Sequence, residues 1–184
     1  MARKSLAEKA ESRTRILGAA AKLIRTNGIE GTTVAEVMEE AGMTHGGFYR
    51  HFDSKEDLVA EAISVAVQDA LNFFSSGDSA TREEATAYVS NYATKEHARA
   101  MASGCPIPLL SAEVARGSDA WRDALRAGVT KTTKKLTDGL NLKDEADALV
   151  LLSTLVGGLL IARGVGEGAL QDKLLSGITE RVQA

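Results

Sequence analysis

Residues 32–58, TTVAEVMEEAGMTHGGFYRHFDSKEDL, decide the fold, because they contain two short helical patterns joined by a glycine turn. The apolar residues of the first pattern recur at the spacing of one helix face: Val34, Val37, Met38 and Ala41. Gly42 follows at once and takes a left-handed conformation at no steric cost, so we expect the first helix to end there. An apolar stripe on so short a helix requires a partner helix.

The second pattern begins at Thr44, whose hydroxyl is expected to cap a helix. Met43 and Phe48 are spaced as a hydrophobic staple, and Phe52 lies one turn beyond Phe48. Both phenylalanines are therefore expected to pack on the first helix. The other positions then lie on the outer side, which holds no Leu, Val or Ile that needs burial: Thr44, His45, Gly46, Gly47, Tyr49, Arg50 and His51.

An outward face of this kind suits the major groove of DNA, since arginine pairs with guanine while hydroxyls and rings contact bases or phosphates. Gly46 and Gly47 each weaken a helix by roughly 1 kcal/mol relative to alanine, which makes sense where backbone approaches DNA closely. Thr33 and Lys55, at the starts of two helices, are expected to contact phosphates. The alternative is an ordinary amphipathic hairpin with a surface arginine and two surface histidines.

The same run resembles the DNA-binding signature of the TetR family of bacterial repressors. The residues that carry the resemblance are Thr33, Ala35, Ala41, Gly42, Gly47, Tyr49, His51, Phe52, Ser54, Lys55, Glu56 and Leu58. The resemblance implies an all-α fold with an N-terminal three-helix helix-turn-helix DNA-binding domain (residues 1–58). It also implies a C-terminal helical domain (residues 59–184) that binds a small effector and forms a homodimer, so that effector binding releases an operator.

Composition agrees with a compact protein of 184 residues, 44% hydrophobic but only 4% aromatic, which suits packed helices. The formal net charge is −3, yet residues 1–25 carry seven cations and two acids. Arg3 and Lys4 belong to a basic terminal arm. Two interpretations stay open: the arm follows a DNA groove, or it is a basic terminus without a role in binding. One cysteine and a charged N-terminus without an apolar segment indicate a cytoplasmic protein without a signal peptide.

The C-terminal part is expected to hold an effector pocket where aromatic and apolar side chains meet the irregular segment 104–108, which contains both prolines. The candidate lining residues are Tyr88, Val89, Tyr92, Met101, Cys105, Leu109, Trp121 and Leu125. The segment also resembles a TetR subgroup with a Gly-Cys motif, some members of which sense electrophiles. Cys105 beside Pro106 is expected to be partly exposed, so two triggers stay open: covalent reaction at the thiol or a reversible ligand.

Residues 148–162, ALVLLSTLVGGLLIA, carry no charge. Fifteen residues are too few for a membrane span of about 20, so we expect a soluble helix buried on all sides and no membrane partner. With the amphipathic pattern of residues 170–182 it predicts a four-helix dimer interface. Its candidate residues are Leu152, Leu155, Val156, Gly158, Leu159, Leu174 and Ile178. The alternative is an internal helix of a monomer.

No catalytic set, metal-ligand spacing or phosphate-binding loop emerges, so we expect neither an enzyme nor a metal or other cofactor. The sequence therefore predicts a ligand-responsive transcriptional repressor that binds a palindromic double-stranded operator as a homodimer. The alternatives are an architectural or chromosome-organising DNA-binding protein without an effector, and an enzyme with a DNA-binding head. The effector and the operator sequence stay open.

Overall fold

The computed structural model describes residues 6–75, 77 and 79–182, and every regular element in that part of the chain is a helix. The all-α prediction is therefore confirmed. The elements are α1 (Leu6–Asn27), α2 (Val34–Glu40), the 3-10 helix η1 (His45–Arg50), α3 (Lys55–Leu71), α4 (Arg82–Tyr92), α5 (Lys95–Arg99), α6 (Ile107–Arg116), α7 (Asp119–Leu140), α8 (Glu145–Val165) and α9 (Ala169–Val182).

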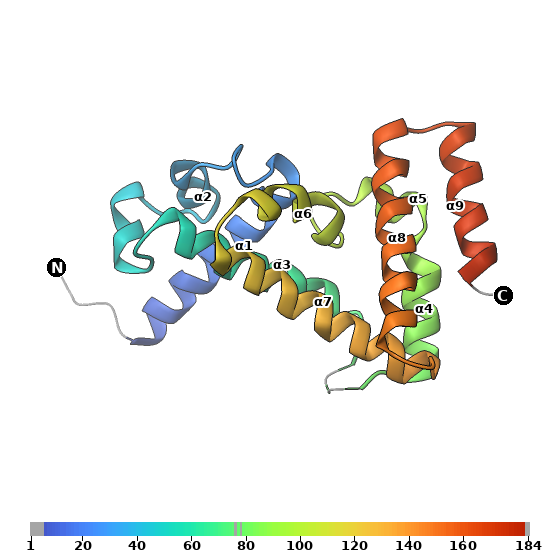
Figure 1. The fold of residues 1–184 in the computed structure, drawn as a ribbon. Coiled ribbons are helices and arrows are strands. Elements are labelled where there is room, and N and C mark those ends of the chain that lie inside the picture. Colours follow the sequence, from blue (N-terminus) through green and yellow to red (C-terminus); the bar gives the residue numbers. More distant parts are fainter. Residues whose placement is uncertain (1–5, 76, 78, 183–184) are drawn as a thin grey trace.

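Helix α3 joins the two halves of the molecule. Figure 1 shows α1 and α2 at one end, α4, α8 and α9 at the other, and α3 beside α7 between them. The buried residues of α3, from Leu58 to Leu71, belong to one continuous core that α1 and α7 also contact. The boundary predicted at residue 58 falls within the first turn of this helix and stays a prediction.

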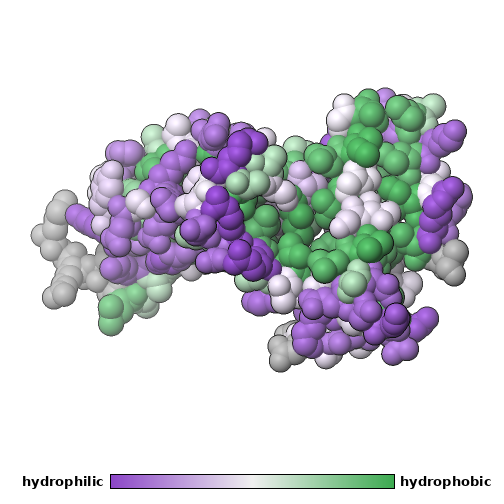
Figure 2. All heavy atoms as spheres, in the orientation of Figure 1, coloured by the Kyte–Doolittle hydropathy of each residue, from purple (hydrophilic) through white to green (hydrophobic). Residues whose placement is uncertain are grey.

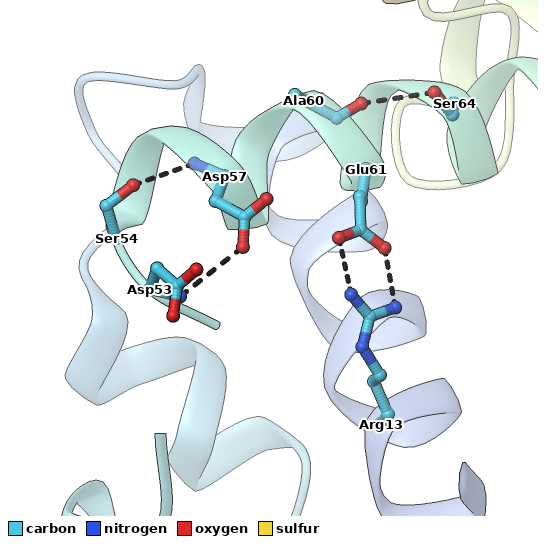
Figure 3. Close-up of polar contacts among 7 residues, drawn as sticks. All are labelled: Arg13, Asp53, Ser54, Asp57, Ala60, Glu61 and Ser64. Atoms are coloured by element: carbon cyan, nitrogen blue, oxygen red, sulfur yellow. Dashed lines mark hydrogen bonds and ion pairs between the residues drawn. The ribbon is translucent and has the colours of Figure 1, made fainter. Parts of the chain in front are cut away.

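The helix starts follow the capping residues of the sequence. Thr33 and Glu36 form a reciprocal capping box at α2, and Gly42 ends that segment with φ +67°. At α3 the Ser54 Oγ accepts from the Asp57 N–H at 3.0 Å (Figure 3). The Asp57 carboxylate reaches back to the N–H of Asp53 at 3.4 Å rather than to the cap residue itself. These bonds satisfy amide groups that have no partner inside the helix.

Glycines let α7 approach its neighbours closely. A Cβ on Gly128 would lie 2.5 Å from Cγ1 of Val67 on α3, and a Cβ on Gly139 would lie 2.6 Å from Cβ of Ala85 on α4. Helix α7 ends at Asn141, which takes the left-handed conformation with φ 52°. The close crossing of α3 and α7 thus depends on the missing side chain of Gly128.

Three of the cations among the first 25 residues are paired with acids. Arg13 forms a bidentate ion pair with Glu61 (Figure 3). Lys22 pairs with Glu40 at 2.6 Å, and the buried Arg25 pairs with an acid of α3. The sequence could not show these partners, because most lie more than 40 residues away. Arg3 and Lys4 of the predicted arm lie outside the described residues.

Five of the residues predicted to contact a partner subunit are instead buried inside the single chain: Leu152, Leu155, Gly158, Leu159 and Ile178. A Cβ on Gly158 would lie 2.0 Å from Cδ1 of Ile178. The glycine therefore serves the packing of α8 on α9 within one chain. Val156 and Leu174 are partly buried against the same core.

The opposite side of α8 is an exposed apolar face, made of Leu149, Val150, Leu160, Ile161 and Val165. Figure 2 shows hydrophobic residues gathered over this helix. Helix α8 has 21 residues, and an 18-residue window has a mean hydropathy of 2.0 with 33% of it buried. By length and composition alone the helix could therefore cross a membrane, a test that a core helix of a soluble protein also passes, so the expected absence of a membrane partner stays a prediction.

Candidate nucleic-acid interface and effector pocket

The second helix of the predicted DNA-binding unit is the short 3-10 helix η1. Its bonds run over three residues, as from the Gly47 N–H to the Thr44 carbonyl at 2.9 Å. Two glycines in six residues favour this short form over an α-helix. Thr44 precedes η1 in extended backbone, but its side chain makes no cap bond, so the predicted hydroxyl cap is wrong.

Phe48 anchors η1, and its neighbours project outward. Phe48 and Phe52 are buried with ring centroids 5.7 Å apart, as predicted. Tyr49 is 73% exposed, and its ring meets that of Phe48 edge-on at 5.1 Å. Thr44, His45, Gly46 and Arg50 are also exposed, while Gly47 and His51 are half-buried. A buried phenylalanine pair thus orients a polar outer face.

The protein's own packing does not explain the two glycines of η1. No heavy atom lies within 4 Å of a Cβ built on Gly46, and the nearest to one on Gly47 is Cε of Met38 at 3.5 Å. Neither residue has positive φ. Alanine would therefore fit at both positions and favour the helix. A surface that must come close to η1 from outside explains the choice better.

The predicted phosphate contacts differ in their surroundings. The Thr33 N–H and hydroxyl both donate to the Glu36 carboxylate, at 2.8 and 2.7 Å. These two hydrogen bonds lower the pKa of Glu36, with a smaller contribution from Lys55, so a negative charge occupies this helix start. Lys55 is half-buried at the first residue of α3. Lys55 is thus the better placed of the two for a phosphate.

The main candidate pocket, about 530 Å³, lies among α3, α4, α5 and the turn before α6. Of the predicted lining residues, Tyr88, Tyr92 and Cys105 line it, whereas Val89, Met101, Leu109, Trp121 and Leu125 do not. Sequence reasoning missed most of the other lining side chains, among them Asp69, Asn72, Phe73, Asn91, Glu96 and His97. Of these residues, only Phe73 is suggested by the sequence, because it lies next to Phe74, which continues the apolar spacing of α3.

Trp121 lies at the junction with the DNA-binding half instead of in the pocket. Its Nε1 donates to the Glu56 carbonyl at 3.1 Å, in the first turn of α3. A Cβ on Gly117 would lie 2.1 Å from the indole Cε3, so the ring rests on that glycine. Helix α7 begins beside the start of α3, which carries Trp121 away from the pocket. The single tryptophan of the chain therefore probes this junction.

His97 connects three parts of the pocket wall. Its Nε2 accepts from the Cys105 N–H at 3.1 Å, which assigns the proton to Nδ1, 2.9 Å from the Tyr92 carbonyl. Its own carbonyl accepts from Nη2 of Arg163 on α8 at 3.0 Å. Burial lowers the pKa of His97, so the neutral ring is favoured. We refer to Tyr92, His97, Cys105 and Arg163 as the His97 cluster.

Cys105 is buried, with 5% of its surface exposed, so the expected partial exposure was wrong. Burial raises the pKa of the thiol, although Tyr92 and, less strongly, Arg163 and Arg25 act in the opposite direction. Because the thiolate is the reactive form, a shielded thiol with a raised pKa is a poor nucleophile. This environment favours a reversible ligand over covalent reaction at Cys105.

Two contacts join the pocket to the DNA-binding half. Arg25 of α1 donates to Asp69, a pocket residue, at 3.1 Å and to the Ala66 carbonyl at 3.3 Å. The Glu113 carboxylate of α6 accepts from the N–H groups of Ile29 and Glu30 at 2.7 and 3.3 Å. A shift of α3 or α6 at the pocket is therefore transmitted directly to α1 and to the loop before α2.

Comparison with known proteins covers the DNA-binding half best. Residues 16–62 match the model of bacterial regulatory proteins of the tetR family. The regulator AcrR of Shigella flexneri is 41% identical over 61 residues, 33% of this chain and 28% of its own length. The repressor KstR2 of Rhodococcus jostii is 39% identical over 61 residues and 30% of its length. This chain therefore matches less than a third of either relative.

Longer similarities extend into the C-terminal half. An uncharacterized HTH-type regulator of Mycobacterium tuberculosis is 29% identical over 164 residues, covering 82% of this chain and 84% of its own. A TetR regulator of Chloroflexus aurantiacus has the same fold, with TM-score 0.76, 23% identity and 97% of each chain covered. Reduced E. coli NemR has TM-score 0.71 and 22% identity, covering 92% of this chain and 96% of its own. The DNA-binding segment of this chain thus matches the tetR family of bacterial regulatory proteins, and the chain as a whole has the fold of TetR-family structures.

Proposed function

We propose that this protein is a cytoplasmic transcriptional repressor, and not an enzyme, that binds a palindromic operator as a homodimer and releases it when a small effector binds. The outer face of η1 carries the proposal, because it exposes Tyr49 and Arg50 beside two glycines that internal packing does not require. Arginine and tyrosine at such a position read base edges and phosphates.

The apolar face of α8 supports the homodimer. A two-fold axis through this face would bury Val150, Leu160 and Ile161 against their own copies and bring two η1 helices to successive half-sites. A membrane would cover the same face, and sedimentation in detergent-free buffer separates the two arrangements. A single three-helix head offers few contacts, so two heads are needed for specific binding.

Ile161→Glu is expected to convert the dimer into a folded monomer at micromolar concentration. Ile161 is 55% exposed in the single chain, so the change spares the core, but a dimer would force the carboxylate into an apolar interface at a cost of several kcal/mol. Sedimentation velocity measures the effect. Leu6→Glu, at a 90% exposed position on α1, is the control and should stay dimeric. A dimeric Ile161→Glu would place the interface elsewhere.

The pocket favours an effector-controlled repressor over an architectural DNA-binding protein, because its lining residue Asp69 is bonded to Arg25 of α1, and α6, which follows the pocket turn, is bonded to the loop before α2 through Glu113. A ligand with different affinities for two positions of α3 and α6 would shift the spacing of the two heads. Selection of bound sequences from a random DNA pool tests the proposal. A repressor should enrich one palindrome, whereas an architectural protein should bind most sequences alike.

Gly46→Ala is expected to stabilise the folded protein slightly yet weaken operator binding. Open space around the Cβ position and an ordinary φ predict a gain of about 0.5–1 kcal/mol in the free energy of unfolding. A methyl group at a surface pressed against DNA should reduce operator affinity by roughly tenfold. Chemical denaturation and fluorescence anisotropy measure the two effects. Unchanged affinity would mean that η1 does not approach DNA at this residue.

A further inference from the structure

The His97 cluster contains two buried hydrogen-bond donors without a nitrogen or oxygen acceptor among the described residues. The Tyr92 side chain is 2% exposed, and its hydroxyl lies beside the Cys105 thiol, a weak acceptor, with no nitrogen or oxygen partner there. Nη1 of Arg163 is likewise buried and without a partner, and this guanidinium forms no ion pair in the described chain. Buried donors in folded proteins almost always have acceptors. The Tyr92 hydroxyl and the Arg163 guanidinium therefore lack an acceptor that a ligand can supply.

Both donors belong to side chains that contact the same residue of the pocket wall, His97. The rings of Tyr92 and His97 meet edge-on at 4.7 Å, and Arg163 is tied to the His97 carbonyl by its other terminal nitrogen. A Cβ on Gly104 would lie 3.0 Å from Nη2 of Arg163 and 3.0 Å from Cδ2 of His97. Gly104, Tyr92, His97 and Cys105 all line the pocket. The donors thus lie at or directly behind its inner wall.

The rest of the pocket suits an aromatic ring. Phe73 meets Tyr88 edge-on at 5.6 Å, and the rings of Tyr88 and Tyr92 are tilted at 5.5 Å, so three rings border the same space. A further ring can add to such a cluster in an edge-to-face or offset arrangement. Of the two acidic residues, Asp69 is paired with Arg25, and Glu96 lies exposed. Neither acid therefore neutralises the positive charge of Arg163 behind the pocket wall.

We propose that the effector is an aromatic carboxylic acid, whose ring lies among Phe73, Tyr88 and Tyr92 and whose carboxylate accepts from the Tyr92 hydroxyl and the Arg163 guanidinium. This assignment rests on the proposed effector-controlled function and names its ligand class. A planar guanidinium with a free edge matches a carboxylate, and a tyrosine hydroxyl adds a further donor. Burial keeps the pKa of Tyr92 above its ordinary value, so the hydroxyl stays a donor.

Entry of the carboxylate also provides a route to the DNA-binding half. Both donors are shielded from solvent, and Gly104 lies against Arg163, so we infer that an acid reaches them by a movement of the turn at Gly104 and Cys105. That turn runs directly into α6, whose Glu113 holds the amides of Ile29 and Glu30. An acid that binds only the moved state would shift α6 toward it.

The test uses the whole 184-residue chain. It compares the binding of benzoate with that of benzamide and benzylamine, which keep the ring but change the charge. Affinities are measured by calorimetry without DNA in the wild type and in Tyr92→Phe, Arg163→Met and Arg99→Met. We expect benzoate to bind tightest of the three. We expect Tyr92→Phe and Arg163→Met each to weaken it roughly tenfold or more, because each loses a charged hydrogen bond. The control Arg99→Met, an exposed arginine that pairs with Glu167 outside the pocket, should stay within about twofold.

Stronger binding of benzylamine, no measurable binding of benzoate, or equal benzoate affinity in wild type and Tyr92→Phe would overturn the proposal. Tyr92→Phe keeps the ring and its packing, so it remains informative if Arg163→Met fails to fold. Operator release is measured separately. Benzoate binding that depends on Tyr92 but releases no operator would support the site and contradict effector control. Operator release by other compounds without benzoate binding would support effector control and contradict the acid.

Discussion

Replacing Tyr49 and Arg50 together with alanine is expected to abolish specific operator binding while the protein stays folded and dimeric. Both side chains are exposed on η1, and neither belongs to the core. Each base or phosphate contact is worth roughly 1–3 kcal/mol, and the proposed dimer contains each residue twice, so the combined loss should remove specificity. Fluorescence anisotropy with the selected operator at several salt concentrations measures the loss.

The matched control removes an arginine from another exposed site. Arg126 on α7 is paired only with Asp123 in the next turn, so Arg126→Ala changes the net charge without touching η1. It should retain almost all of the operator affinity. If the double variant bound the operator as tightly as the wild type, the assignment of η1 as the recognition element would be wrong, whatever the family similarity suggests.

Gly128→Leu is expected to destabilise the protein strongly, because it drives a side chain into Val67 where α7 crosses α3. Even a Cβ would lie 2.5 Å from Cγ1 and 3.1 Å from Cβ of Val67, so the helices must separate. Overpacking of this kind costs about 1–3 kcal/mol, and the larger leucine should reach the upper end. Denaturant unfolding followed by Trp121 fluorescence measures the loss and reports the same junction.

Gly18→Leu is the control for Gly128→Leu, since Gly18 also lies inside a helix but has no heavy atom within 4 Å of its Cβ position. Leucine is the better helix former, so this variant should be as stable as the wild type or more stable. Equal stability of Gly128→Leu and Gly18→Leu would show that α3 and α7 do not need their close approach.

The sequence predicted the local structure well, because caps and apolar periods act over a few residues. Thr33, Gly42 and Ser54 mark helix ends in the structure as in the sequence. The exception is η1, where two glycines and a short length turned an expected α-helix into a 3-10 helix. Predicting that change requires comparing two weak helical forms, and apolar spacing does not distinguish them.

The pocket and the dimer face were predicted only in part, because they depend on how distant helices pack. Tyr92 and Cys105 were found, but His97 and Arg163 join them through bonds between residues that sequence spacing does not relate. For α8, the uniformly apolar composition does not show which side of the helix faces α9. Trp121 was misplaced because the course of α7 along α3, and not its aromatic character, decides its neighbours.

The shared helix α3 limits how far this protein can be treated as interchangeable modules. A chimera that joins residues 1–58 to another effector domain would cut α3 in its first turn and discard Asp69, the partner of the buried Arg25. A junction after Leu71 would keep that pair but still lose Glu113, the acceptor for the loop before α2. Hybrid regulators built on this head must therefore carry α3 whole and supply a carboxylate opposite Ile29.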